Sequence, residues 1–261
     1  MNKRVTFCFL TIILFAAFFS QIWTKLYPVT YPSPTQAQLD FCQENNQINW
    51  INAAKTNEKT ISAAWCQITA AKNKIIPVVV DGSEHQPNAY IQIKYLKPKL
   101  TIHPLFLSES NQSLLFVLSH EYHHYLYGHS WARSLRTVLL SISFIFLIGW
   151  LYPTKNTPFT QSLMDILPYT LMWLTFFYYS YASFIQEEVD ADLGAAAYFK
   201  SIGLSPIDGI NELSKTTKNF GPTKNVPSMI ECLNPKYLLN MNNCNPHPTI
   251  EYRTKQVAKN F

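Results

Sequence analysis

The distribution of apolar and polar positions divides the chain into segments of different kinds. The first segment, residues 5–24, carries no charge and follows Lys3 and Arg4. Its twenty residues would rise about 30 Å as a helix, which is the thickness of the hydrocarbon core of a membrane. A cleavable signal peptide has a shorter apolar centre and small residues at its cleavage site. We therefore interpret the segment as a retained transmembrane anchor, with a signal peptide as the alternative.

A proline-rich stretch, "YPVTYPSPT" at residues 27–35, predicts a stiff extended linker because proline blocks helix formation. In residues 36–73 apolar side chains recur at helix-like spacing, and we expect this segment to be largely helical. The apolar positions are Ile48, Ile51, Ile61, Trp65 and Ile68.

Three short runs after residue 74 predict a small sheet. "IIPVVV" at 75–80 is β-branched and is ended by the turn-rich "DGSEHQPN", which is typical of a strand followed by a turn. "AYIQIKY" at 89–95 alternates apolar and polar positions, as a half-buried strand does. "KLTIHPLFL" at 99–107 can form a third strand.

The second half of the chain is dominated by helical patterns. From residue 108 onward serine and asparagine precede an apolar-periodic helix that contains "SHEYHHYLYGHS". Two uncharged runs follow, at 137–152 and 166–184. Their lengths favour a transmembrane hairpin, and the alternative is a pair of buried helices in a soluble secreted protein. A shorter helix is expected at "SPIDGINELSK", residues 205–215.

Composition agrees with contact between the chain and lipid. Charged residues make up 14 % of the sequence, against about 25 % in ordinary soluble domains. The net charge of +5 is spread along the chain without a basic run. We therefore expect no nucleic-acid partner.

Four of the five cysteines lie in polar sequence and none forms a CxxC pair. This pattern gives no support to a cysteine zinc knuckle or a thioredoxin-type redox motif, and it favours an oxidising compartment with two disulfides. The simplest pairing joins Cys42 to Cys66 and Cys232 to Cys244, although four cysteines allow three pairings. Four unpaired buried thiols in a cytosolic domain are the alternative.

The histidine-rich stretch contains HExxH, formed by His120, Glu121 and His124. On a helix, residues four apart point in directions that differ by about 40°, so both imidazoles can reach one ion. A glutamate next to the first histidine can accept the proton of a water molecule at a metalloprotease site. His123 and His129 point elsewhere, and we expect them to be outer partners or surface groups.

A catalytic zinc site needs three protein ligands and one open position. The third ligand has to come from another part of the chain. In "QEEVDADLG" Glu188 and Asp192 lie four apart on one helical face. Glu188 can complete a set of two histidines and one carboxylate, and Asp192 can then hydrogen-bond an imidazole and fix its tautomer.

These motifs resemble those of the membrane-integrated zinc endopeptidases that include the CAAX prenyl protease and HtpX. That family carries HExxH on one helix and ExxAD on a later helix, which "EVDAD" at 188–192 matches. Several members insert a transmembrane hairpin between the two motifs. "PNAY" at 87–90 is similar to the family's edge strand, and "HPTIEYR" at 247–253 is similar to its HPxxxxR element.

The resemblance implies an α+β fold: a mainly helical, zincin-like domain with a small sheet, an N-terminal anchor and an inserted transmembrane hairpin. It implies one Zn²⁺ per chain, bound by His120, His124 and Glu188, with Glu121 as the general base. It also suggests that His247 or Arg253 lies near the cleft, where a cation could steady the tetrahedral intermediate or pair with Asp192.

The edge strand that contains Asn88, Ala89 and Tyr90 could bind an extended peptide through main-chain hydrogen bonds. A protected edge without that role is the alternative. The expected boundaries are an anchor at 1–24, the first part of the catalytic domain at 25–136, the hairpin at 137–185 and the second part at 186–261.

The basic residues near the N-terminus and the cysteines favour an inner-membrane protein with a periplasmic catalytic domain, whereas Arg133 and Arg136 argue for the opposite orientation. Glu188 comes four residues after Phe184, so the site would lie near the bilayer surface. We therefore expect a membrane-proximal or extracytoplasmic polypeptide substrate and contact with the lipid bilayer. A zinc-stabilised membrane scaffold or binding module without proteolytic activity is the alternative function.

Overall fold

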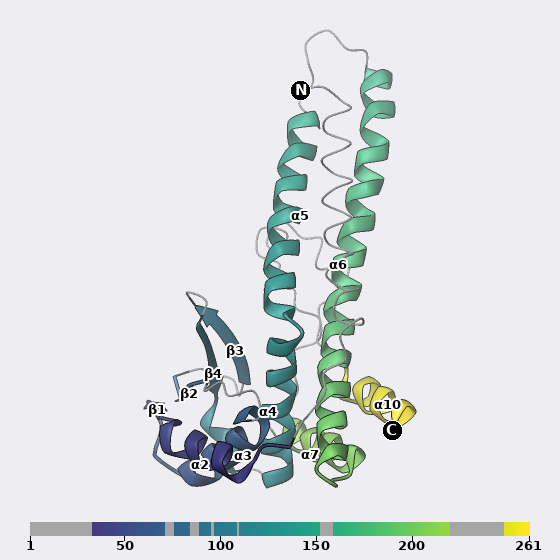
Figure 1. The fold of residues 1–261 in the computed structure, drawn as a ribbon. Helices are drawn as coiled ribbons and strands as arrows, with labels where there is room; N and C mark the ends of the chain where they lie inside the picture. The colour runs from purple at the N-terminus through teal and green to yellow at the C-terminus, as the bar shows by residue number, and fades with distance from the viewer. Residues whose placement is uncertain are drawn as a thin grey trace. The chain divides into compact units, whose positions relative to one another are not determined.

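The computed structural model describes residues 33–70, 76–83, 89–94, 97–108, 110–151, 159–219 and 248–261 (Figure 1). They fall into two units. The first, here the sheet unit, holds the described residues from 33 to 130, from 187 to 219 and from 248 to 261. The second, here the long-helix unit, holds residues 131–151 and 159–186. Each unit is described separately.

The sheet unit contains a four-stranded mixed sheet with the order β1-β2-β4-β3. Its strands are β1 (Ile48–Ile51), β2 (Val78–Asp81), β3 (Ala89–Lys94) and β4 (Lys97–Ile102). β2 pairs in parallel with β1 and with β4, whereas β3 and β4 form an antiparallel pair. The strand predicted at 75–80 is confirmed for residues 78–80, and the one predicted at 89–95 is confirmed for residues 89–94. The third ends at Ile102, and Pro104–Ser108 forms a short 3-10 helix, η2.

The expectation of largely helical structure at 36–73 is wrong at its centre. Helices α2 (Gln36–Asn45) and α3 (Glu58–Thr69) flank β1, which contains Ile48 and Ile51. Four residues carry too little periodicity to separate a strand from a helix turn. β2 decides the outcome because it pairs with all four residues of β1. Asn52 and Asn57 then adopt positive φ angles of 49° and 54°, so the backbone leaves the strand without continuing as a helix.

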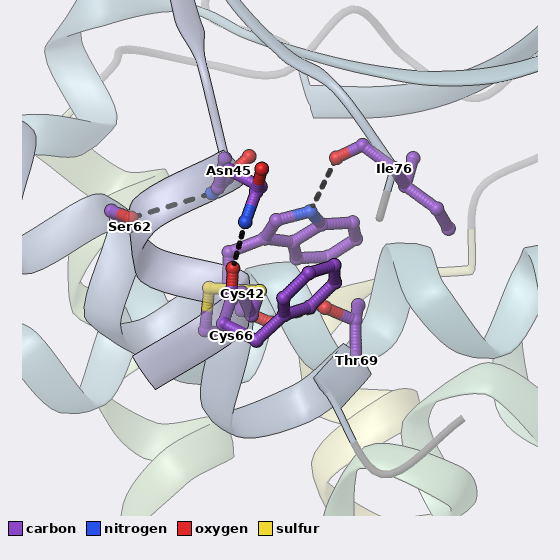
Figure 2. Close-up of a disulfide and its surroundings, with 9 residues drawn as sticks. Cys42, Asn45, Ser62, Cys66, Thr69 and Ile76 are labelled. Carbon is purple, nitrogen blue, oxygen red and sulfur yellow. Dashed lines mark hydrogen bonds between the residues drawn. A yellow bond between two sulfur atoms is a disulfide. The ribbon is translucent and has the colours of Figure 1, made fainter. Parts of the chain in front are cut away.

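A disulfide between Cys42 and Cys66 joins α2 to α3, as the sequence predicts (Figure 2). Thr35 begins α2 with a capping box in which its side chain accepts from the backbone N–H of Gln38. The indole of Trp65 is buried and donates to the carbonyl oxygen of Ile76 at 2.8 Å. This bond connects α3 to the residues that lead into β2. The predicted Cys232–Cys244 pair lies outside the described residues.

Helix α4 (Asn111–Leu126) is the central element of the sheet unit (Figure 1). Ser110 caps it by accepting a hydrogen bond from the backbone N–H of Ser113 at 3.2 Å. α4 packs against α3, β3, η2 and α7 (Pro206–Asn219), and α7 in turn contacts α10 (Ile250–Asn260). The core includes buried side chains from each of these elements and from the rest of the sheet: Ile61, Trp65, Val78, Val80, Ile91, Leu100, Ile102, Phe106, Phe116, Leu118, Ile210 and Val257. The fold is thus mainly helical with a small mixed sheet, which agrees with the predicted α+β class.

Helices α5 (His129–Leu151) and α6 (Phe159–Ser201) contribute the described residues of the long-helix unit. Both uncharged runs of the sequence are therefore helical over most of their length. In the part of the chain that the structure describes, no helix has the length and hydropathy that a membrane span requires. The predicted hairpin at 137–185 is not confirmed, and the predicted anchor at 1–24 lies outside the described residues.

Candidate metal centre

Helix α4 presents the two histidines of the HExxH motif to the same point in space. The Nε2 atoms of His120 and His124 lie 3.0 Å apart, and their ring centroids lie 4.6 Å apart. Both residues are buried, with 6 % and 8 % of their surface exposed. This geometry follows from the i, i+4 spacing, which places the two side chains next to each other on one helical face.

Helix α6 brings a carboxylate to the same point from a distant part of the sequence. Glu188 is 1 % exposed, and its two oxygens lie 3.5 Å from Nε2 of His120 and 3.4 Å from Nε2 of His124. The ligand atoms of the three residues lie within 4.8 Å of one another, an arrangement that could hold a metal ion. Neighbouring ligands around a tetrahedral zinc ion are about 3.4 Å apart, so the donor set fits such an ion.

Glu121 lies at the edge of the cluster. Its Oε1 atom is 3.9 Å from Nε2 of His120, and its side chain keeps 13 % of its surface exposed. Glu121 is therefore close to one of the three candidate ligands and also accessible to solvent. This is the position that a proton acceptor for a water molecule requires.

Asp192 lies one helical turn after Glu188 and contacts the other side of the His120 ring. Its Oδ1 atom is 2.9 Å from Nδ1 of His120, and the residue is completely buried. Arg253 of α10 donates to the same carboxylate through Nε at 2.7 Å and Nη2 at 2.6 Å. Of the two roles expected for a cation here, the structure shows the pairing with Asp192.

The charges of His120, Asp192 and Arg253 depend on one another. Burial opposes protonation of His120, but its hydrogen bonds to Asp192 and Glu188 prevail and raise the pKa of His120 to about 9. Burial also disfavours the charged form of Asp192, yet the Arg253 guanidinium and His120 hold the pKa of that carboxyl below its usual range. The Asp192 carboxylate thus stabilises a positive charge on His120. It contacts Nδ1 of the ring, whereas Glu188 lies near Nε2.

Two further histidines of the stretch are buried. Of the two alternatives expected for His123 and His129, outer partner or surface group, exposures of 0 % and 3 % exclude the surface position. Nδ1 of His123 donates to the carbonyl oxygen of Ser119 at 2.6 Å, and burial lowers the pKa of His123 to about 4. Nδ1 of His129 lies 2.7 Å from Nδ1 of His124. The sequence signal for this contact was Gly128, because a glycine there lets the chain turn back after α4.

The other predicted site residues are distributed as follows. Ala89 and Tyr90 begin β3, the strand at one end of the sheet, and β3 packs against α4. Asn88 and His247 lie outside the described residues.

The model of a protein family described as Peptidase family M48 matches residues 53–260. This range includes both helices that supply the candidate ligands and also Arg253. No curated protein and no solved structure matches the chain.

Proposed function

The chain belongs to peptidase family M48, the family of the CAAX prenyl protease and HtpX zinc metalloproteases, and from that premise we propose that it is a membrane-anchored zinc endopeptidase. The family indicates a metallopeptidase. The observation that carries the proposal is the convergence of His120, His124 and Glu188 within 4.8 Å of one another, with Glu121 at their edge.

Zinc suits this donor set better than calcium or magnesium. Two imidazole nitrogens and one carboxylate are typical of a catalytic zinc ion, whereas calcium and magnesium prefer sites built from oxygen alone. Three protein ligands leave a fourth position open, as catalysis requires. When bound, the ion would lower the pKa of a water molecule to near neutrality and would polarise the scissile carbonyl.

The chain's own residues then supply the proton transfers and the positioning. Glu121 accepts the proton of the attacking water and passes it to the leaving amine. Asp192 accepts a hydrogen bond from Nδ1–H of His120, which leaves Nε2 of that ring to face the cluster. Arg253 holds the Asp192 carboxylate in place with two donated hydrogen bonds. We also propose the second role expected of Arg253, which is to steady the negative charge that develops on the tetrahedral intermediate.

An extended polypeptide is the substrate that the sheet supports best. β3 lies at one end of the described sheet, and β4 pairs with only one of its edges. A peptide can add to an open edge through main-chain hydrogen bonds. Because β3 packs against α4, a peptide on this edge would run past the helix that carries Glu121.

We further propose attachment to the inner membrane with the catalytic domain in the periplasm. The uncharged runs of the sequence support the attachment. So do large apolar side chains that are exposed at helical spacing on α5 and α6: Trp131, Leu135 and Val138, then Leu167, Leu171, Leu174 and Tyr178. The Cys42–Cys66 disulfide supports an oxidising compartment. Substrates would then be membrane-proximal or extracytoplasmic polypeptides.

Two variants of the full-length, detergent-solubilised protein test the proposal. The probe is a mixture of unstructured peptides, and cleavage is followed by mass spectrometry. We expect Glu121→Gln to retain zinc and to lose cleavage by at least about a hundredfold, because the proton acceptor is removed. We expect Glu188→Ala to lose both zinc and cleavage.

Bound zinc is measured by elemental analysis of each purified protein. Equal cleavage by Glu121→Gln and the wild type would exclude the proposed mechanism. Zinc bound by the wild type without cleavage of any peptide would favour a zinc-stabilised scaffold.

A further inference from the structure

We propose that His129 is a positioning residue that fixes the tautomer and the orientation of His124, and thereby sets the affinity of the site for its metal. The inference rests on the proposed function in one respect, namely that His124 is a metal ligand. It concerns a residue outside the HExxH and ExxAD motifs, at the start of the next helix.

The turn between α4 and α5 brings His129 back toward His124. Gly128 has a φ angle of 68°, a conformation that costs other residues about 1–2 kcal/mol. The backbone N–H of Gly128 donates to the carbonyl oxygen of Tyr125 at 3.1 Å and closes the end of α4. His129 then begins α5, with its ring centroid 4.9 Å from that of His124 at an interplanar angle of 70°.

The contact between the two rings couples their tautomers, because only one of the two Nδ1 atoms can carry the shared proton. Nε2 of His124 faces Nε2 of His120 and Oε1 of Glu188 at 3.0 and 3.4 Å, so Nε2 is the atom that would bind the metal. A neutral imidazole that binds a metal through Nε2 carries its proton on Nδ1. With a metal on Nε2, Nδ1 of His124 would donate to Nδ1 of His129, 2.7 Å away, and His129 would carry its own proton on Nε2.

The two histidines of the cluster thus have different outer partners. Nδ1 of His120 meets the carboxylate of Asp192, whereas Nδ1 of His124 meets a neutral ring. In each case an acceptor fixes which nitrogen faces the metal, the usual arrangement around metal-bound histidine. His129 is 3 % exposed, so bulk water has little access to replace it as the acceptor.

A matched pair of variants separates this role from simple packing. Asparagine and leucine have nearly the same shape, and the amide oxygen of asparagine stands close to the position of Nδ1 of histidine. His129→Asn therefore keeps an acceptor for His124, and His129→Leu removes it. We expect His129→Leu to weaken Zn²⁺ binding roughly 10–100-fold, as is typical when an outer partner is lost. His129→Asn should stay within about threefold of the wild type.

Zinc affinity is measured on the full-length protein by competition with a chromophoric chelator. A second measurement uses metal-free protein with ¹⁵N-labelled histidine, in which NMR reports the tautomer of each ring. His124 should carry its proton on Nδ1 in the wild type and in His129→Asn, and should populate both tautomers in His129→Leu. A residue that only fills space would not change the tautomer.

Equal zinc affinities of the two variants, or an unchanged tautomer in His129→Leu, would overturn the inference. Thermal unfolding checks that both variants are folded, and His129→Phe replaces the leucine variant if that protein does not fold. The test is independent of peptide cleavage. If Glu121→Gln cleaves peptides as fast as the wild type, the proposed function fails, and the NMR result on the metal-free protein still decides the role of His129.

Discussion

Gly194 on α6 lies against the imidazole of His123 on α4, so close that a Cβ atom at position 194 would come within 2.2 Å of Cδ2 of that ring. The ring cannot move aside easily, because it is completely buried and bonded to the carbonyl oxygen of Ser119. The missing side chain at 194 therefore lets α6 approach α4. This approach occurs less than two helical turns from Glu188, the residue that α6 contributes to the metal cluster.

Gly194→Ala should lower the free energy of unfolding by about 1–3 kcal/mol, because the added methyl group overfills a packed contact. In a His123→Ala background the same change should be neutral or should stabilise the protein, since alanine favours helix over glycine by about 1 kcal/mol. Denaturant unfolding of the four metal-free proteins measures the difference. The same loss of stability in both backgrounds would show that His123 is not the obstacle.

Arg253→Met should lower the free energy of unfolding by about 3–5 kcal/mol, because Asp192 would remain charged and buried with His120 as its remaining partner. The structural basis is the pair of hydrogen bonds from Arg253 to Asp192, which is 0 % exposed. Asp192→Asn in the same protein removes the charge and should restore part of the loss. Denaturant unfolding of zinc-free protein provides the measurement. Equal stabilities of the single and double variants would contradict this account.

Replacement of both Cys42 and Cys66 by alanine should lower the free energy of unfolding by about 3 kcal/mol. The disulfide closes a loop with a sequence separation of 24, and its removal gives the unfolded chain more conformational freedom. Guanidinium unfolding compares the variant with the oxidised wild type. The single Cys42→Ala variant is the control and should be about as unstable as the double variant. A double variant as stable as the oxidised wild type would exclude a stabilising role for this bridge.

Tyr198→Phe should make stability less sensitive to alkaline pH. Burial raises the pKa of the Tyr198 hydroxyl above its ordinary value, so the folded protein holds this proton more tightly than the unfolded chain does. The contribution of Tyr198 to stability is therefore complete below about pH 10 and decreases as the pH rises further, by up to about 1.4 kcal/mol per pH unit. The free energy of unfolding, measured from pH 8 to 11 for both proteins, gives the two slopes. Parallel curves would show that folding does not raise the pKa of Tyr198.

The sequence by itself determined the elements that local periodicity specifies. HExxH had to lie on a helix with His120 and His124 on one face, because apolar residues recur with helical spacing just before the motif. The β-branched run at 78–80 and the alternating run at 89–94 form strands for similar local reasons. Even the Cys42–Cys66 pairing could be predicted, although from the number and setting of the cysteines rather than from any periodicity.

Only the tertiary structure decided which distant residues meet. It showed that the Glu188 carboxylate reaches the two histidines, that Arg253 pairs with Asp192, that β1 is a strand, and that His129 contacts His124. Periodicity reports which face of an element is buried but does not identify the side chain that lies opposite. Which side chain lies opposite depends on packing, and packing acts between residues far apart in the sequence. Two examples are Gly194, which lets α6 approach α4, and Gly128, which turns the chain back after α4.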